Sequence, residues 1–139
     1  MSAALLNIAG PRGSELLAAV TSGSLCSALS AALALKWLLV APVVEELFFR
    51  TMIQRWLLTR SRGRWKWWGV SAANAVTAVL FSAAHLAYGG LTQAILVTAP
   101  GLLLGVVYEK TGRVIVCMAL HAAMNFIWMG VICATARLL

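Results

Sequence analysis

The chain has 139 residues, of which 62% are hydrophobic and only 11% are charged, and its formal net charge is +7. A soluble domain has roughly 45–50% apolar and about 25% charged residues, so this composition excludes an ordinary soluble protein and predicts a single membrane-embedded domain over residues 1–139. The positive charge does not indicate nucleic-acid binding, because the basic residues gather between apolar runs, as they do in the loops of membrane proteins.

Apolar segments along the chain predict an all-α, polytopic transmembrane helix bundle with about five membrane-embedded helices. Residues 1–14 are rich in turn-forming residues, and the first span after them contains many small residues that permit close helix packing. The predicted spans cover residues of about 16–40, 42–59, 69–88, 91–108 and 114–135.

Pro42 separates the first two predicted spans. Because proline lacks a backbone N–H and its ring clashes with the preceding turn, we expect Pro42 to end or kink the first helix and to start the second. Glu45 and Glu46 would then lie in or near a first helical turn, where the helix dipole favours anions. The second span is short for a hydrocarbon core of ~30 Å, so we expect protein to shelter it in part.

The connections between the later spans are basic or rich in glycine. Residues 59–68 combine arginine and lysine with tryptophan, and we expect this loop to face the cytoplasm, with the N-terminus on the same side. Residues 109–113 predict a tight turn before the last span. Gly101 and Gly105 permit a close helix contact, which could lie inside the bundle or between two copies of the chain.

Two adjacent carboxylates, Glu45 and Glu46, lie in an apolar segment, where an ionisable side chain costs about 2.5–3.5 kcal/mol at the centre of a membrane helix. Glu46 and Arg50 have the i, i+4 spacing that brings opposite charges together, and we interpret them as a structural ion pair. Glu45 instead has Phe48 and Phe49 one turn ahead, an apolar surrounding that suits a general base.

Both histidines also lie in apolar segments, His85 at the end of F-S-A-A-H and His121 on one helix face with Asn125 in H-A-A-M-N. Taken singly, His85 is more simply explained by a hydrogen bond to a backbone carbonyl, and the other pair could equally hold two helices together. Together with Glu45, however, they supply a base, a proton-shuttling partner and donors for an oxyanion from three separate spans.

A metal centre is the alternative arrangement of the same residues, because Glu45, His85 and His121 could hold zinc together with a water molecule. The sequence contains no H-E-x-x-H pair, which would favour zinc. We therefore predict a catalytic group of Glu45, His85, His121 and Asn125 that works without a cofactor.

These segments resemble the motifs of the CPBP family, the CAAX protease and bacteriocin-processing membrane peptidases, also called the Abi family. A-P-V-V-E-E-L-F-F-R is similar to its E-E-x-x-x-R motif, F-S-A-A-H to F-x-x-x-H, and H-A-A-M-N to H-x-x-x-N. G-L-L-L-G-V-V-Y-E-K-T-G resembles the glycine-containing helix and turn between the last two. The four motifs occur in the family's order over residues of about 41–126.

The resemblance implies an intramembrane endopeptidase with a shortened version of the CAAX prenyl protease type II core. It implies that Glu45 and His85 activate water and that His121 and Asn125 form the oxyanion site. The family was long described as metallopeptidases, and the resemblance favours a glutamate-dependent mechanism without metal over one that uses zinc. The implied substrates are membrane-associated peptides or lipidated proteins, either prenylated and CAAX-type or bacteriocin-like.

Two features depart from the family pattern. Only a short leader and one predicted helix precede the first motif, whereas family members have more spans, and Thr51 stands where the family often has glycine. The first departure raises the question of whether the chain is complete or assembles with a partner protein or a second copy. A second hypothesis is therefore a non-catalytic immunity or scaffold protein that keeps the fold and binds a peptide.

Overall fold

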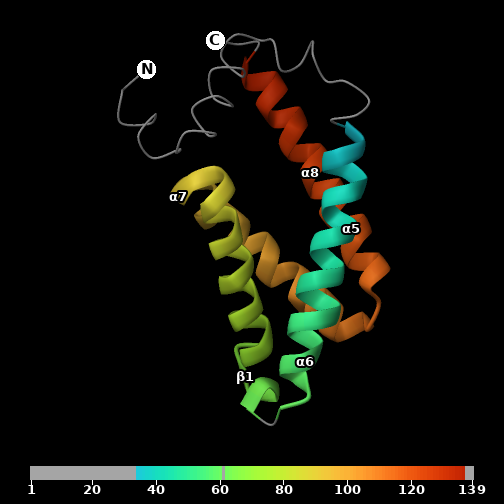
Figure 1. The fold of residues 1–139 in the computed structure, drawn as a ribbon, viewed down its shortest axis with the longest axis vertical. Coiled ribbons are helices and arrows are strands. Elements are labelled where there is room, and N and C mark those ends of the chain that lie inside the picture. Colours follow the sequence, from blue (N-terminus) through green and yellow to red (C-terminus); the bar gives the residue numbers. More distant parts are fainter. Residues whose placement is uncertain (1–33, 61, 137–139) are drawn as a thin grey trace.

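The computed structural model describes residues 34–60 and 62–136, and the structural statements below concern these ranges (Figure 1). The predicted N-terminal segment and most of the predicted first span lie outside the described residues. The elements are η1 (Lys36–Val40), α5 (Ala41–Glu46), η2 (Leu47–Gln54), α6 (Arg55–Leu58), η3 (Arg62–Arg64), β1 (Lys66–Trp67), β2 (Val70–Ser71), α7 (Ala72–Thr111) and α8 (Val114–Ala136). The described chain is thus mostly helical, as the sequence predicts.

The first four elements of the described residues form one continuous helix over residues 36–58, which is called the first helix below. In it, the π-helical segments η1 and η2 flank α5. Pro42 lies in the first turn of α5, as expected, but the expectation that it ends the preceding helix is wrong, because the residues on both sides of α5, Val40 and Leu47, keep right-handed helical dihedral angles. Proline cannot donate to the carbonyl oxygen four residues back, and the wider π-helical turn of η1 gives its ring room within the helix.

Glu45 and Glu46 therefore lie inside this helix, and the first turns of η1 and α5 carry no acidic residue. The expectation that a helix dipole stabilises these two carboxylates is wrong for the same reason, since the dipole acts mainly on the terminal turn. Side chains must supply the compensating charge instead.

A short β-hairpin joins this helix to α7. β1 and β2 pair in antiparallel fashion, with Lys66 opposite Ser71, and the turn residues Trp68 and Gly69 both have positive φ, at 53° and 81°. The predicted third span begins near residue 69, whereas α7 begins at Ala72. The reason is a side-chain cap: Ser71 Oγ accepts a hydrogen bond from the Asn74 backbone N–H at 2.9 Å.

α7 consists of two helices that meet at Gly90, whose dihedral angles (φ 74°, ψ −176°) are accessible mainly to glycine. The two halves run in opposite directions beside each other (Figure 1), and Asn74 Nδ2 donates to the carbonyl oxygen of Leu102 at 3.0 Å.

Gly105 lies at the contact between the two halves of α7, because a Cβ atom there would stand 1.8 Å from Asn74 Oδ1. A Cβ atom at Gly101 would likewise stand 3.2 Å from the ring of Phe81. Within the described residues, the two glycines thus serve the internal packing of the bundle.

Gly112 ends α7 with a positive φ of 64°, and α8 begins two residues later at Val114. The turn is therefore shorter than the predicted segment 109–113, because residues up to Thr111 remain helical. The apolar side chains of Leu104, Tyr108 and Cys117 form a buried cluster between α7 and α8.

Two described helices are long and apolar enough to cross a membrane, Gly89–Thr111 and Val114–Thr135, and Ala72–Ala87 is apolar but shorter. The positions of these three helices agree with those of the last three predicted spans. The described residues establish an all-α architecture with two helices of spanning length, which is fewer than the total of about five spans expected from the sequence.

Substitution of Gly105 by alanine is expected to destabilise the fold by about 1–3 kcal/mol, because the new methyl group would displace the buried Asn74 side chain. The matched control is Gly130→Ala in α8, where a Cβ atom would meet no atom within 4 Å. Thermal unfolding in detergent should show a lower midpoint for Gly105→Ala and an unchanged or higher one for Gly130→Ala. Equal midpoints for the two variants would contradict the packing described here.

Candidate active site

Glu45, His85 and His121 come from three different helices and meet inside the bundle. Glu45 Oε2 lies 3.9 Å from His85 Nε2 and 3.7 Å from His121 Nε2. Both distances are too long for direct hydrogen bonds. Three of the four predicted catalytic residues therefore lie around one small volume.

Glu46 faces a different set of partners from Glu45. Arg50 Nε donates to Glu46 Oε2 at 2.8 Å, and His121 Nδ1 lies 2.9 Å from Glu46 Oε1. The Glu46 and Arg50 side chains are fully buried. Because a carboxylate can only accept, Nδ1 of His121 carries the proton of this bond. The sequence reasoning predicts the contact with Arg50 and misses the bond to His121.

His85 is oriented by its own helix and by aromatic rings. Its Nδ1 donates to the carbonyl oxygen of Phe81 at 2.8 Å, so in the neutral ring Nε2 carries the lone pair and faces Glu45. The Phe81 ring packs against the imidazole with a centroid distance of 4.4 Å, and Phe49 packs edge-on against Phe81 at 5.0 Å. The backbone contact expected for a lone histidine is therefore present together with the contact to Glu45.

Glu45 Oε2 is buried and has no hydrogen-bond partner within the part of the chain that the structure describes. The two predicted aromatic neighbours of Glu45 differ in burial. Phe49 is buried in the aromatic cluster, whereas Phe48 is 47% exposed. A buried carboxylate oxygen without a partner, close to two histidine nitrogens, is a candidate site for a polar reactant.

Asn125 lies one turn after His121 on α8, as the spacing predicts, but its hydrogen bond leads away from Glu45. Nδ2 donates to the backbone carbonyl of Trp37 in η1 at 2.9 Å. This bond uses one of the two N–H groups of the amide. It also joins the beginning of the first helix to α8 close to His121.

Among the described His, Cys, Asp and Glu residues, no group of three or more is arranged to hold a metal ion. The side chains of Glu46 and Arg50 occupy the other side of His121, where they bond to each other and to Nδ1.

Two residues that the sequence analysis did not single out continue the polar network. Gln54 is fully buried at the end of η2, and its amide bonds to Arg50 and to Glu109. The available signal was spacing, because Glu46, Arg50 and Gln54 recur every fourth residue on one face of an otherwise apolar helix. The sequence places Glu109 in a predicted turn, and a turn position gives no indication of a contact with another helix.

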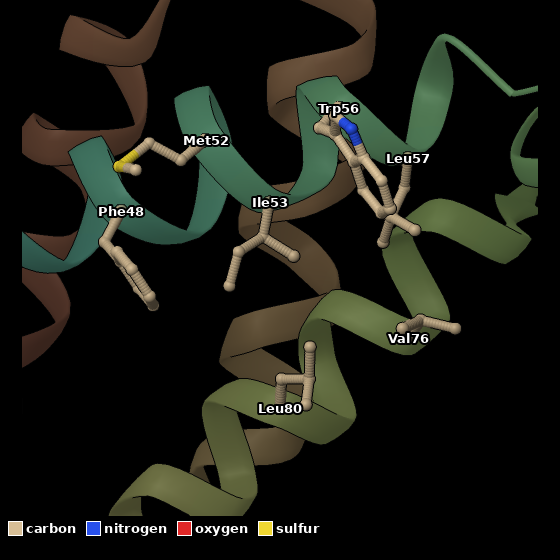
Figure 2. A pocket seen from close by; sticks show the side chains of 7 residues that line it. All are labelled: Phe48, Met52, Ile53, Trp56, Leu57, Val76 and Leu80. Carbon is tan, nitrogen blue, oxygen red and sulfur yellow. The ribbon is translucent and has the colours of Figure 1, made fainter.

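An apolar pocket with a volume of about 660 Å³ lies on the outer side of the first helix. Figure 2 shows that its side chains come from the first helix and from the first half of α7. They are Phe48, Met52, Ile53, Trp56, Leu57, Val76 and Leu80. Several of these are more than 40% exposed, so the pocket opens to the surface, and Phe48 places one end of it a single turn from Glu45.

The structure thus places a carboxylate beside two histidines in a bundle in which two described helices are long and apolar enough to span a membrane. A family model described as "Type II CAAX prenyl endopeptidase Rce1-like" matches residues 27–127 of the chain. The chain therefore belongs to the Rce1-like type II CAAX prenyl endopeptidase family, which generally comprises peptidases, and is an integral membrane protein. Comparisons with curated proteins and with solved structures gave no match.

Substitution of Arg50 by alanine is expected to destabilise the protein by about 3–5 kcal/mol, because it leaves the Glu46 carboxylate buried without its cation. The double variant Glu46→Gln/Arg50→Met removes both charges and should recover part of this loss. Arg55→Ala, on the exposed side of the same helix, is the control and should change stability by about 0.5 kcal/mol or less. A double variant less stable than Arg50→Ala would contradict the ion-pair interpretation.

Proposed function

We propose that this protein is an intramembrane endopeptidase that hydrolyses a peptide bond in a membrane-associated peptide or protein. The observation that supports this most directly is the buried Glu45 Oε2 atom, which has no partner among the described residues and stands within 4 Å of two histidine nitrogens. Membership of a family of CAAX-type endopeptidases supports the same reaction.

In the proposed reaction, Glu45 acts as the general base. A water molecule between Glu45 Oε2 and His85 Nε2 would donate one hydrogen bond to each, because both atoms are acceptors when His85 is neutral. The two acceptors orient the oxygen lone pair toward the substrate, and Glu45 takes a proton as the water oxygen attacks the carbonyl carbon. His85 holds the water and shuttles the proton.

His121 and Asn125 would stabilise the oxyanion that forms when the carbonyl carbon becomes tetrahedral. When His121 carries a second proton, Nε2 becomes a donor, and the Glu46 carboxylate on Nδ1 compensates the charge of the ring. The second N–H of the Asn125 amide is the other donor, with the first held by Trp37. Collapse of the intermediate then breaks the C–N bond, and the proton taken by Glu45 passes to the leaving amine.

The surroundings of the site support an apolar substrate. The pocket that includes Phe48 is lined by aliphatic and aromatic side chains (Figure 2). It would accommodate a lipid chain or an apolar peptide segment. We propose a prenylated CAAX-type protein or a bacteriocin-like peptide as substrate, presented within a multi-pass bundle whose basic loop, residues 59–68, faces the cytoplasm. A non-catalytic immunity or scaffold function is not favoured, because it requires no base beside two histidines.

Glu45→Gln and His85→Ala are each expected to lower the cleavage rate by about 10²–10⁴-fold, because they remove the base and its proton-shuttling partner. The assay uses purified protein in liposomes with a farnesylated CAAX-type peptide and with a bacteriocin-like peptide, and product formation is followed by mass spectrometry. His121→Ala and Asn125→Ala should also lower the rate, with the smaller effect at Asn125, whose amide is shared with Trp37.

Thr77→Val is the control for this assay. Thr77 is as fully buried as Glu46, but among the residues that the structure describes its hydroxyl bonds only within its own helix, to the carbonyl oxygen of Ala73 at 2.7 Å. This variant should keep the wild-type rate. Unchanged cleavage in Glu45→Gln would rule out the role given to Glu45 and favour the scaffold function.

Removal of divalent metals is expected to leave the cleavage rate unchanged, because the described carboxylates and histidines do not form a group that could hold a metal ion. The measurement compares wild-type protein before and after dialysis against a chelator, with the metal content of both samples determined. A loss of activity that stoichiometric zinc restores would overturn this prediction and assign a metal-dependent mechanism.

A further inference from the structure

The polar network of the site does not end at Arg50. The guanidinium Nη1 donates to Gln54 Oε1 at 3.2 Å, and Gln54 Nε2 donates to Glu109 Oε1 at 2.9 Å. Together with the bonds of Glu46 to His121 and Arg50, these contacts form an unbroken chain of hydrogen bonds from His121 on α8 to Glu109 on α7.

The orientation of the Gln54 amide follows from its neighbours. Arginine can only donate, so the oxygen of the amide must face Arg50 and the nitrogen must face the acceptors. Both N–H groups of that nitrogen have partners, since Nε2 also donates to the carbonyl oxygen of Gly105 at 3.1 Å. Gln54 is fully buried, and its polar atoms are bonded on both sides. Such an amide holds one conformation rather than several.

Glu109 lies at the end of this hydrogen-bond network that is farthest from His121, near the protein surface. Ser71, the residue that caps α7, donates its hydroxyl to the same Glu109 oxygen that accepts from Gln54. Lys66 Nζ lies 3.7 Å from the other Glu109 oxygen, with side-chain exposures of 58% for Lys66 and 10% for Glu109. The carboxylate is therefore tied to the hairpin, to the start of α7 and to the first helix.

We propose that Gln54 and Glu109 are positioning residues for the His121–Glu46 pair, an inference that rests on the proposed peptidase function. Arg50 has a planar guanidinium whose donors point in fixed directions, so a partner at each end selects one orientation of the whole group. Glu46 holds Nε and Gln54 holds Nη1. The orientation of Arg50 fixes the Glu46 carboxylate, and this carboxylate fixes the ring of His121.

The charges along the chain support the same role. Proceeding from the site, the carboxylate of Glu46 is followed by the cation of Arg50, the neutral amide of Gln54, the carboxylate of Glu109 and the cation of Lys66. Opposite charges thus follow one another, and Glu46, Arg50 and Gln54 are fully buried, where electrostatic interactions are stronger than in water. Loss of the outer carboxylate would leave Gln54 with one acceptor fewer and Arg50 less firmly held.

The first test is kinetic and uses Gln54→Met, which keeps the approximate shape of the side chain without its hydrogen bonds. We expect the turnover number kcat on the farnesylated peptide to fall about 10- to 100-fold with KM unchanged, because a small displacement of a catalytic group slows the reaction without removing substrate contacts. Thr77→Val is the matched control, because Thr77 is equally buried but does not take part in the hydrogen-bond network from His121 to Glu109. A purely structural role would lower the yield of folded protein but leave kcat per folded molecule at the wild-type value.

The second test uses Glu109, whose side chain is 10% exposed, whereas that of Gln54 is fully buried. Glu109→Leu removes the acceptor for Gln54 and should lower kcat in the same way as Gln54→Met. Glu109→Gln keeps an acceptor oxygen and should restore most of the activity. Equal rates for Glu109→Leu and wild type would overturn the proposal.

The third test does not depend on catalysis. The sequence contains only two histidines, so ¹⁵N-histidine labelling gives a simple spectrum in which His121 is assigned with a His121→Gln variant. The Nδ1–H resonance of His121 should shift in Gln54→Met and Glu109→Leu and stay in place in Thr77→Val. An unshifted resonance in the folded Gln54→Met protein would overturn the proposal. If the wild type cleaves no peptide, the proposed function fails, and this spectrum alone decides the positioning role.

Discussion

The fully buried carboxylate of Glu46 is the group on which the rest of the site depends. It accepts from Arg50 on its own helix and from His121 on α8, at 2.8 and 2.9 Å, so a single charge joins two helices. A carboxylate without such partners would be very costly in this apolar interior. The need of this carboxylate for hydrogen-bond donors therefore favours the packing of α8 against the first helix. With Nδ1 of His121 bonded to Glu46, the other ring nitrogen, Nε2, faces Glu45.

The backbone supports this arrangement at two places. The helix continues through Pro42 with π-helical segments on both sides, and such segments are frequent at functional sites because they change the direction of the side chains that follow. On α7, the reversal at Gly90 returns the chain along itself, and the absence of a side chain at Gly105 lets the two halves approach closely. His85 is thereby brought to the same volume as His121, although it comes from the half of α7 that precedes the reversal.

Much of the candidate site was predictable because ionisable residues are rare in this chain. Glu45, His85 and His121 stand out against apolar segments, and the structure brings these three together. Gln54 was not foreseen, because a glutamine in an apolar helix has no charge to mark it and its partners Arg50 and Glu109 are identified only by tertiary contact. Asn125 has the predicted helical position, whereas its bond to Trp37 depends on where the first helix crosses α8.

The sequence alone determined the helical class, the positions of the later helices and the residues able to carry chemistry. Apolar composition is a local property of the sequence, and an apolar segment in a membrane forms a helix whatever its tertiary contacts are, because its backbone groups must bond to one another. Tertiary structure decided which partner each polar group has. Adjacent residues on a helix point about 100° apart, so Glu45 and Glu46 face different neighbours, and only the packing of α7 and α8 decides which histidine atoms each carboxylate meets. For the same reason, the continuity of the helix at Pro42 and the internal contact of Gly105 could be observed only in the folded chain.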